Sequence, residues 1–387
     1  MRHIYFYFSL IICLLIGCPK MYAQKIITGA DRIEDYLPLL ESKRVGLVVN
    51  HTSVISTVDG LSYKPLPDSL ISRGVNVKCI MAPEHGYKGI AEAGEHLKNG
   101  QDSQTGLKIY SLYGNTKKPQ KEWMEDIDII VFDMQDVGAR FYTYLSTLYY
   151  VMEACGDYDK ELMVLDRPNP NDYIDGPVLE EKFKSFVGII PIPLLHGCTL
   201  GELAQMMNGE DWQPMTKNII IVPCENWKHG VKYDCPIAPS PNLPNPHAIN
   251  IYPSLCLFEG TSVSVGRGTS YPFECYGHPN MQGDFYFKPK PTQSNKNPLQ
   301  NGKYCKGEDL RRRSDIVGFD LSFLLNAYKQ LGPSFITSES FFDKLAGTDM
   351  LRKQILSGKT KKQIKDSWKK DLDNYKEIRA KYLLYTE

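Results

Sequence analysis

The chain has 387 residues, and its 45 basic and 45 acidic side chains give a formal net charge of zero. This length is sufficient for two domains, or for one large domain with an ample core. The balanced charge lacks the basic excess typical of nucleic-acid-binding proteins, so we expect no nucleic-acid partner.

The first 23 residues have the features of a signal peptide. A positive charge near the start is followed by an apolar stretch at 4–17, which has signal-peptide length and is too short to span a membrane as a mature helix. Cleavage before Cys18 would leave a lipid anchor on that residue, whereas cleavage after Ala23 would release a soluble protein. Because Pro19 directly follows the cysteine, we favour the soluble form, exported to the periplasm. No later stretch predicts a transmembrane segment.

From about residue 25 to 225, short apolar strands alternate with segments of helical spacing. The predicted strands cover 45–49, 75–81, 129–132, 162–165 and 218–222. The predicted helices cover 31–40, 66–73, 143–155 and 200–207. Thr199 and Glu202 have the spacing of a capping box at the start of the last of these helices. The alternation predicts an α/β domain with a doubly wound, mostly parallel sheet of Rossmann-like topology. Neither GxGxxG after a strand nor GxxxxGKS/T occurs, so we expect no nucleotide cofactor.

Residues 226–387 predict a second, auxiliary domain of the α+β class. The run 236–253 is rich in proline and asparagine, so we expect an ordered loop or linker there and no helix. Helical spacing returns at 319–331 and 343–356, and 362–385 predicts one long amphipathic helix.

Eight cysteines follow the N-terminal segment, and none belongs to a CxxC pair. This spacing argues against a zinc knuckle or a thioredoxin-type site. Cys79 and Cys155 lie inside apolar strand and helix patterns, which is typical of cysteines that act as small buried hydrophobic residues. Export permits disulfides, but the spacing does not indicate a pairing.

Polar side chains gather where the predicted strands end. These residues are Asn50, His51, Glu84, His85, Asp133, Asp136, Arg140, Tyr142, Asp166, Arg167 and Asn169. Because the carboxyl ends of parallel strands meet at one edge of a sheet, we expect the side chains to line one cleft. Sugar-binding sites need this mixture of amides, carboxylates, aromatic rings and arginines. The alternative for any single residue is a helix cap or a local ion pair.

Glu84 is the best candidate for the general acid of a glycosidase. It follows a predicted strand, and Gly86 two residues later allows the backbone to turn sharply. A local cap or ion pair is the alternative. We expect His85 to orient Glu84. Either Asp133 or Asp136 could be the second carboxylate, and we assign Asp136 to the catalytic set and Asp133 to the substrate-binding set. The separation of the two carboxylates would decide between inversion and retention.

Other classes of function remain open. A metal hydrolase would draw its ligands from His51, Glu84, His85, Asp133 and His196, but no HExxH or HxH spacing occurs. A serine hydrolase is disfavoured because the sequence has no GxSxG elbow. An exported sugar-binding protein without turnover also fits a two-domain chain, although the density of adjacent acids and bases argues against it.

Six motifs resemble the NamZ-type exo-β-N-acetylmuramidase family, which was long known only as a domain of unknown function. They are PEHGYKG (83–89), FDMQDVGARFYTYLSTL (132–148), LDRPNP (165–170), DGPVLE (175–180), PSPNLP (239–244) and YPSLCLFEGTSVSVGRGT (252–269). The resemblance runs from about residue 45 to 385. It implies a glycoside hydrolase in which a cleft lies between a Rossmann-like domain and a C-terminal auxiliary domain. We expect this hydrolase to need no metal or other cofactor. Such an enzyme would release N-acetylmuramic acid from the non-reducing end of peptidoglycan-derived muropeptides or disaccharides, for turnover or salvage of the cell wall.

The resemblance also implies roles for individual residues, with Glu84 as the catalytic acid. The cleft would be lined by Asn50, His51, Arg140, Tyr142, Asp166, Arg167 and Asn169, and closed from the second domain by Asn242, Glu259, Arg267 and Thr269. We further infer that Arg140 or Arg267 faces the lactyl carboxylate of the muramic acid, since guanidinium groups pair well with carboxylates. Lys88 replaces an arginine expected in many relatives, which leaves the proposed catalytic residues unaffected.

Overall fold

The structure is a computed structural model that describes residues 24–387 except 58–59, 93, 96–97, 214–215 and 217. The predicted signal peptide, with Cys18 and both cleavage sites, lies outside the described residues. Within the described part, every helix is too short or too polar to cross a membrane.

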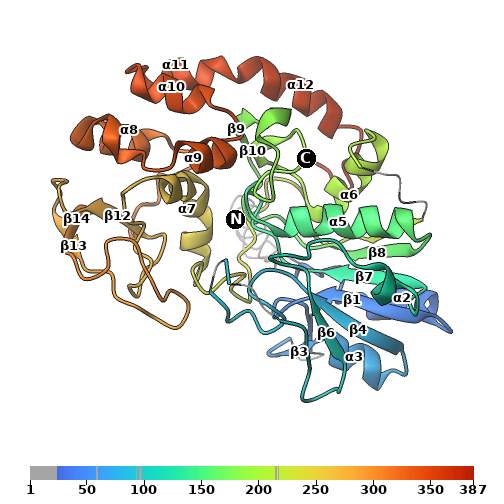
Figure 1. Ribbon diagram of the computed structural model, residues 1–387. Helices are drawn as coiled ribbons and strands as arrows, with labels where there is room; N and C mark the ends of the chain where they lie inside the picture. Colours follow the sequence, from blue (N-terminus) through green and yellow to red (C-terminus); the bar gives the residue numbers. More distant parts are fainter. Residues whose placement is uncertain (1–23, 58–59, 93, 96–97, 214–215, 217) are drawn as a thin grey trace, which may run out of the picture.

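A seven-stranded sheet forms the core of the N-terminal half of the described chain (Figure 1). Its strands are β1 (Arg44–Val49), β4 (Asn76–Ala82), β5 (Gly100–Gln101), β6 (Lys108–Ser111), β7 (Ile129–Asp133), β8 (Glu161–Leu165) and β11 (Ile219–Val222). The order is β11-β8-β7-β1-β4-β6-β5, and all neighbours are parallel except β5 and β6. The strand order reverses between β1 and β7, as in doubly wound folds. The predicted fold class is confirmed.

Helices cover both faces of this sheet. They are α2 (Ile33–Leu40), α3 (Leu66–Ser72), α4 (Lys121–Met124), α5 (Tyr144–Asp157) and α6 (Leu200–Gly209). Alternate side chains of one strand enter different apolar clusters: Ile129 and Val131 pack in one, and Ile130 and Phe132 in the other. Such a strand is buried on both faces, which explains its continuous apolar sequence. The capping box predicted at the start of α6 is present.

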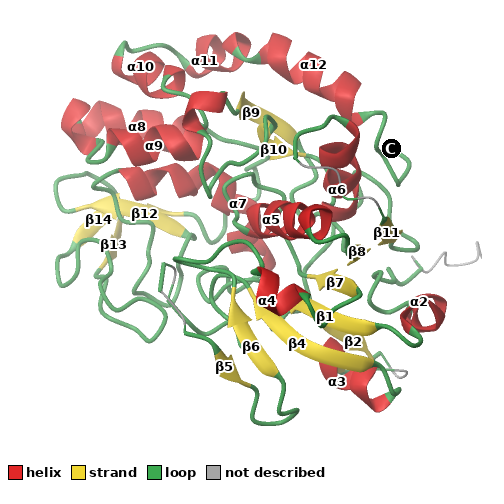
Figure 2. Ribbon diagram, turned by 45° about the vertical axis from the view of Figure 1, so that its right-hand side comes forward, coloured by secondary structure: helices red, strands yellow, loops and turns green. Residues whose placement is uncertain are grey.

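The C-terminal half combines a three-stranded antiparallel sheet with a layer of helices (Figure 2). The sheet contains β12 (Cys275–His278), β13 (Phe285–Phe287) and β14 (Cys305–Asp309). The helices are α7 (Pro246–Leu255), α8 (Ser322–Leu331), α9 (Glu339–Ala346), α10 (Met350–Leu356), α11 (Lys361–Ser367) and α12 (Lys369–Arg379). The remaining elements are the antiparallel pairs β2 (Val54–Ser56) with β3 (Tyr63–Pro65) and β9 (Ile174–Val178) with β10 (Pro193–His196), and the 3₁₀ turns η1 (Glu181–Phe183), η2 (Cys256–Gly260) and η3 (Pro333–Phe335).

The prediction of a loop throughout 236–253 is wrong, because α7 begins inside this run. The Asn245 side chain accepts a hydrogen bond of 2.9 Å from the Ala248 N–H and caps the helix. Pro246 occupies the first turn, where its missing N–H costs nothing. The proline-rich composition therefore concealed a helix start with favourable capping residues.

Two predicted C-terminal helices are shorter in the structure. The segment predicted as one helix over 343–356 divides at Gly347, which has the left-handed φ of 78° and ends α9. The helix predicted over 362–385 divides at Trp368 and ends at Arg379.

All eight cysteines in the described part of the chain are buried, and none of them forms a disulfide. Cys79 lies in β4 and Cys155 in α5, and both side chains are buried in the larger apolar cluster. They act as small core residues, as their apolar sequence context predicts.

Candidate active site

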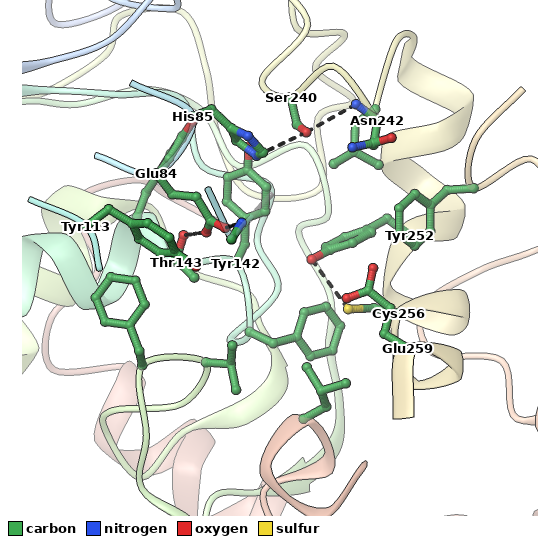
Figure 3. Close-up of a pocket in the computed structure, with 18 of the residues that line it drawn as sticks. Glu84, His85, Tyr113, Tyr142, Thr143, Ser240, Asn242, Tyr252, Cys256 and Glu259 are labelled. Carbon is green, nitrogen blue, oxygen red and sulfur yellow. Dashed lines mark hydrogen bonds between the residues drawn. The ribbon is translucent and has the colours of Figure 1, made fainter. Parts of the chain in front are cut away.

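A cavity of about 440 Å³ lies where the sheet and the C-terminal half meet, and both halves of the chain contribute to its wall (Figure 3). Much of the wall is aromatic, with rings from Tyr113, Phe141, Tyr142, Tyr144, Phe186, Tyr252 and Phe273. Its volume falls in the range of small-molecule binding sites. Aromatic faces beside a few polar groups are suited to a sugar ring.

Glu84 reaches this cavity from the turn that follows β4. Its Oε2 accepts a hydrogen bond of 2.7 Å from the Thr143 hydroxyl, and its Oε1 accepts one of 2.9 Å from the Gly94 N–H. Tyr113 lies beside it, and burial together with the negative charge of Glu84 raises the pKa of the Tyr113 phenol. The carboxyl group is therefore held in one orientation on the cavity wall.

The turn that carries Glu84 has an unusual backbone, which His85 stabilises. His85 has a left-handed φ of 67°, and Gly86 follows with 74°. The His85 Nδ1–H donates a hydrogen bond of 2.8 Å to the Ala91 carbonyl, and Nε2 lies 3.4 Å from the Ser240 hydroxyl. His85 thus links the turn at Glu84 to residue 91 and to the segment around Ser240. Its predicted role in orienting Glu84 stays a prediction.

The crevice between β1 and β7, where doubly wound folds usually bind ligands, is occupied by the protein itself. The His51 Nε2–H donates to the carbonyl of residue 238 at 2.8 Å. The carbonyl of residue 239 accepts from the hydroxyl of Tyr142 at 2.8 Å and from that of Tyr144 at 3.2 Å. Asn50 donates to the Tyr144 hydroxyl at 2.7 Å. Asn50 and His51 therefore hold the segment 238–239 in place and, unlike Tyr142, do not line the cavity.

Asp133 and Arg167 form a buried ion pair with each other. The Arg167 Nε and Nη2 donate to the two carboxylate oxygens of Asp133 at 2.5 and 2.9 Å. Neither residue lines the cavity. Because each charge is satisfied by the other, the predicted substrate-binding roles of this pair are not supported.

Arg140 is enclosed in the protein and does not face the cavity. Its guanidinium donates four hydrogen bonds of 2.7–3.1 Å to backbone carbonyls, which belong to Pro177, Ile192, Leu345 and Ala346. Burial lowers the pKa of Arg140 to about 9. The inference that Arg140 binds the lactyl carboxylate is therefore wrong. The sequence showed that this residue is charged, but it did not show that four backbone carbonyls surround the guanidinium.

Asp136 also lies away from the cavity wall. Its Oδ1 accepts a hydrogen bond of 2.7 Å from the Gly138 N–H, whereas Oδ2 has no hydrogen-bond partner among the described residues. Burial raises the pKa of this carboxyl to about 7. The geometry does not support its predicted role as the second catalytic carboxylate.

Two further residues predicted for the cleft stabilise the protein interior. Asp166 accepts hydrogen bonds from the Tyr385 hydroxyl at 2.6 Å and the Gly201 N–H at 2.9 Å, and burial raises its pKa to about 6. Asn169 donates to the Cys198 carbonyl at 3.0 Å. Neither side chain lines the cavity.

Three of the four residues predicted from the second half do line the cavity. Arg267 forms an ion pair with Glu259 and lies 5.0 Å from the Phe273 ring centroid. Asn242 is 4% exposed, and its Nδ2 has no hydrogen-bond partner among the described residues. Thr269 does not line the cavity, and its hydroxyl donates to the Gly266 carbonyl at 2.6 Å.

Several wall residues were not predicted from the sequence, among them Tyr113, Lys117, Thr143, Phe186, Ser240, Tyr252 and Cys256. Four of them, Thr143, Ser240, Tyr252 and Cys256, lie inside the family motifs. Their place in these motifs was the sequence signal that could have identified them. Tyr113 and Lys117 follow β6, a strand that the apolar pattern did not reveal. Within the described part of the chain, no three His, Cys, Asp or Glu side chains are placed to hold a metal ion.

Comparisons with known proteins identify the family of this chain. The family profiles described as exo-beta-N-acetylmuramidase NamZ, N-terminal and C-terminal, match residues 45–247 and 250–385. The peptidoglycan beta-N-acetylmuramidase NamZ of Bacillus subtilis (strain 168) is 36% identical over 395 residues, which cover 93% of this chain and 92% of that protein.

Two crystal structures of DUF1343 family proteins from Bacteroides fragilis NCTC 9343 are also similar. One of them is 45% identical in sequence and has a TM-score of 0.85, and the match covers 94% of this chain and 100% of that protein's chain. The other is 28% identical in sequence and has a TM-score of 0.80, and the match covers 93% of this chain and 99% of that protein's chain. Two profiles that span most of the sequence, and a relative similar along nearly its whole length, show that this chain belongs to the exo-β-N-acetylmuramidase NamZ family.

Proposed function

We propose that Glu84 is the general acid with which this glycosidase of peptidoglycan releases terminal β-linked N-acetylmuramic acid. The observation that carries the proposal is the carboxyl of Glu84, held by Thr143 and Gly94 on the wall of a cavity of sugar-binding size. A carboxylic acid in this position donates a proton to the bridging oxygen as the glycosidic bond breaks.

The charges on the wall support this choice of acid. Among the described residues, the acidic side chains on the wall are Glu84 and Glu259, which lie on opposite sides of the cavity (Figure 3). Glu259 is paired with Arg267, so its negative charge is already compensated. Glu84 accepts hydrogen bonds from neutral donors and is the carboxyl group available for proton transfer.

The remaining wall groups fit a muramyl sugar. The tyrosine and phenylalanine rings offer faces for the pyranose ring. The Asn242 Nδ2, which has no hydrogen-bond partner among the described residues, is available to donate to a hydroxyl or acetamido oxygen. We expect muropeptides and disaccharides that begin with N-acetylmuramic acid as the natural substrates.

The N-terminal sequence supports action outside the cytoplasm. Residues 1–23 have the charge and apolar stretch of a signal peptide, so we propose that the protein is exported to the periplasm. A lipid anchor at Cys18 is the alternative to a soluble form. Labelling with radioactive palmitate, compared between the wild type and Cys18→Ala, distinguishes them.

Replacing Glu84 by glutamine tests the catalytic assignment. Loss of the proton donor should lower kcat on a 4-nitrophenyl β-N-acetylmuramide by roughly 10²- to 10⁴-fold. A more acidic phenol needs less protonation as it leaves, so the loss should be much smaller with a dinitrophenyl substrate. The matched control is Glu153→Gln in α5, which lies outside the cavity and should retain the wild-type rate.

Three results would count against the proposal. Wild-type kcat in the Glu84→Gln variant would remove Glu84 from the mechanism. Absence of chromophore release by the wild type would favour a muropeptide-binding protein without turnover. Loss of activity in excess chelator, restored by a divalent metal, would favour the metal-dependent hydrolase.

A further inference from the structure

We infer that Lys117 binds a carboxylate of the substrate and thereby contributes to the selection of muramic acid over neutral sugars. The inference rests on the proposed function of the same cavity. It concerns a residue that neither the family motifs nor the strand pattern singled out.

The first argument is the balance of charge on the cavity wall. In the part of the chain that the structure describes, the lysine and arginine side chains on the wall are Lys117 and Arg267, and Arg267 is already paired with Glu259. No acidic side chain of the described residues forms an ion pair with Lys117, whose ammonium group instead lies over the Phe186 ring. The next residue differs, since Lys118 pairs with Asp157 at 2.5 Å and with a second carboxylate at 3.4 Å. Lys117 is thus an uncompensated positive charge at the site.

The second argument is the position of the ammonium group relative to the catalytic acid. The Lys117 Nζ lies 5.0 Å from the centroid of the Phe186 ring, and this ring lies 5.7 Å from that of Tyr113. Tyr113 in turn lies beside Glu84. One continuous stretch of wall therefore connects the acid to the ammonium group. The cation–π contact with Phe186 restricts the lysine side chain while leaving its N–H donors available.

The third argument is the chemistry of the substrate. N-acetylmuramic acid differs from N-acetylglucosamine by a lactyl ether that ends in a carboxylate. A stem peptide, where present, is joined to that carboxyl as an amide and carries carboxylates of its own. An ammonium group in a partly enclosed cavity forms charge-assisted hydrogen bonds with such a group. Losing one contact of this kind should change kcat/KM by roughly 10-fold or more.

The experiment compares Lys117→Met with the wild type on two chromogenic muramides, one with the free lactyl acid and one with its neutral methylamide. The ratio of kcat/KM for acid over amide should fall by roughly 10-fold in the variant, mainly through KM. Lys117→Arg should restore most of the ratio because it restores the charge. The matched control is Lys118→Met, which removes the same charge one residue away and should keep the wild-type ratio.

A second pair of substrates identifies the source of the carboxylate. These are a muramyl disaccharide bearing a stem peptide and the same disaccharide without it. A loss confined to the peptide-bearing compound would assign Lys117 to a peptide carboxylate, and a loss with the lactyl acid would assign it to the lactyl group. Unchanged ratios for both pairs would overturn the inference.

A binding measurement separates this inference from the proposed function. The Glu84→Gln variant should bind free N-acetylmuramic acid more tightly than N-acetylglucosamine in calorimetry, and adding Lys117→Met should remove the difference. This result does not depend on turnover. If the preference persists in the double variant, the role of Lys117 fails even where Glu84 proves to be the acid.

Discussion

Replacing Asp136 by asparagine should stabilise the folded protein at neutral and alkaline pH without abolishing hydrolysis. Burial raises the pKa of this carboxyl from 3.8 to about 7, so the folded state favours the protonated form. Folding raises the pKa of Asp136, so the stability that its protonated form contributes is fully present below about pH 4. This contribution is lost as the pH rises to about 7. Each pH unit in this window costs at most about 1.4 kcal/mol. From pH 5 to pH 8 the variant should therefore gain up to ~3 kcal/mol relative to the wild type.

The assay is urea unfolding at several pH values, followed by tryptophan fluorescence, with the free energy of unfolding compared between the two proteins. Taking the difference cancels the other titrating groups. Asp373→Asn, at an exposed position of α12, is the matched control and should show little dependence on pH. A constant difference between Asp136→Asn and the wild type from pH 5 to pH 8 would refute the reasoning from burial. A large loss of kcat in Asp136→Asn would return Asp136 to the catalytic machinery.

Two further variants test other contacts. Thr143→Val removes the hydroxyl that donates to Glu84. It should lower kcat by about 10-fold, the equivalent of one hydrogen bond, while the melting temperature changes little. An unchanged kcat would show that this contact does not orient the acid. Arg140→Lys keeps the charge, but the lysine cannot reach all four carbonyls. The variant should lower the free energy of unfolding by about 3 kcal/mol. A variant as stable in urea as the wild type would contradict this expected loss.

The parallel sheet was predictable because its central strands are continuous runs of apolar residues. β7 and its neighbours are buried on both faces and read as continuous apolar runs. β6 was missed because only the last of its four residues is buried, so it lacks such a run. The residues after β6 were missed for the same reason, and they include Tyr113 and Lys117 on the cavity wall.

The site was predicted only in part, because a sequence shows which groups are polar but not which partners satisfy them. Glu84, Tyr142 and Arg267 line the cavity as expected. Asp133 comes from an equally suggestive strand end, but its charge is neutralised by Arg167, 34 residues further along the chain. Such long-range pairing depends on the folded arrangement and leaves no local signature.

The four carbonyls around Arg140 also bear on whether the two halves of the chain are separable modules. Two of these acceptors lie at 345–346, in the segment matched by the C-terminal family profile. A fragment ending near residue 247 would retain a deeply placed guanidinium with half of its acceptors missing. An unpaired buried charge of this kind is costly. The N-terminal half should therefore be poorly soluble when expressed alone, and co-expression with the C-terminal half should rescue it.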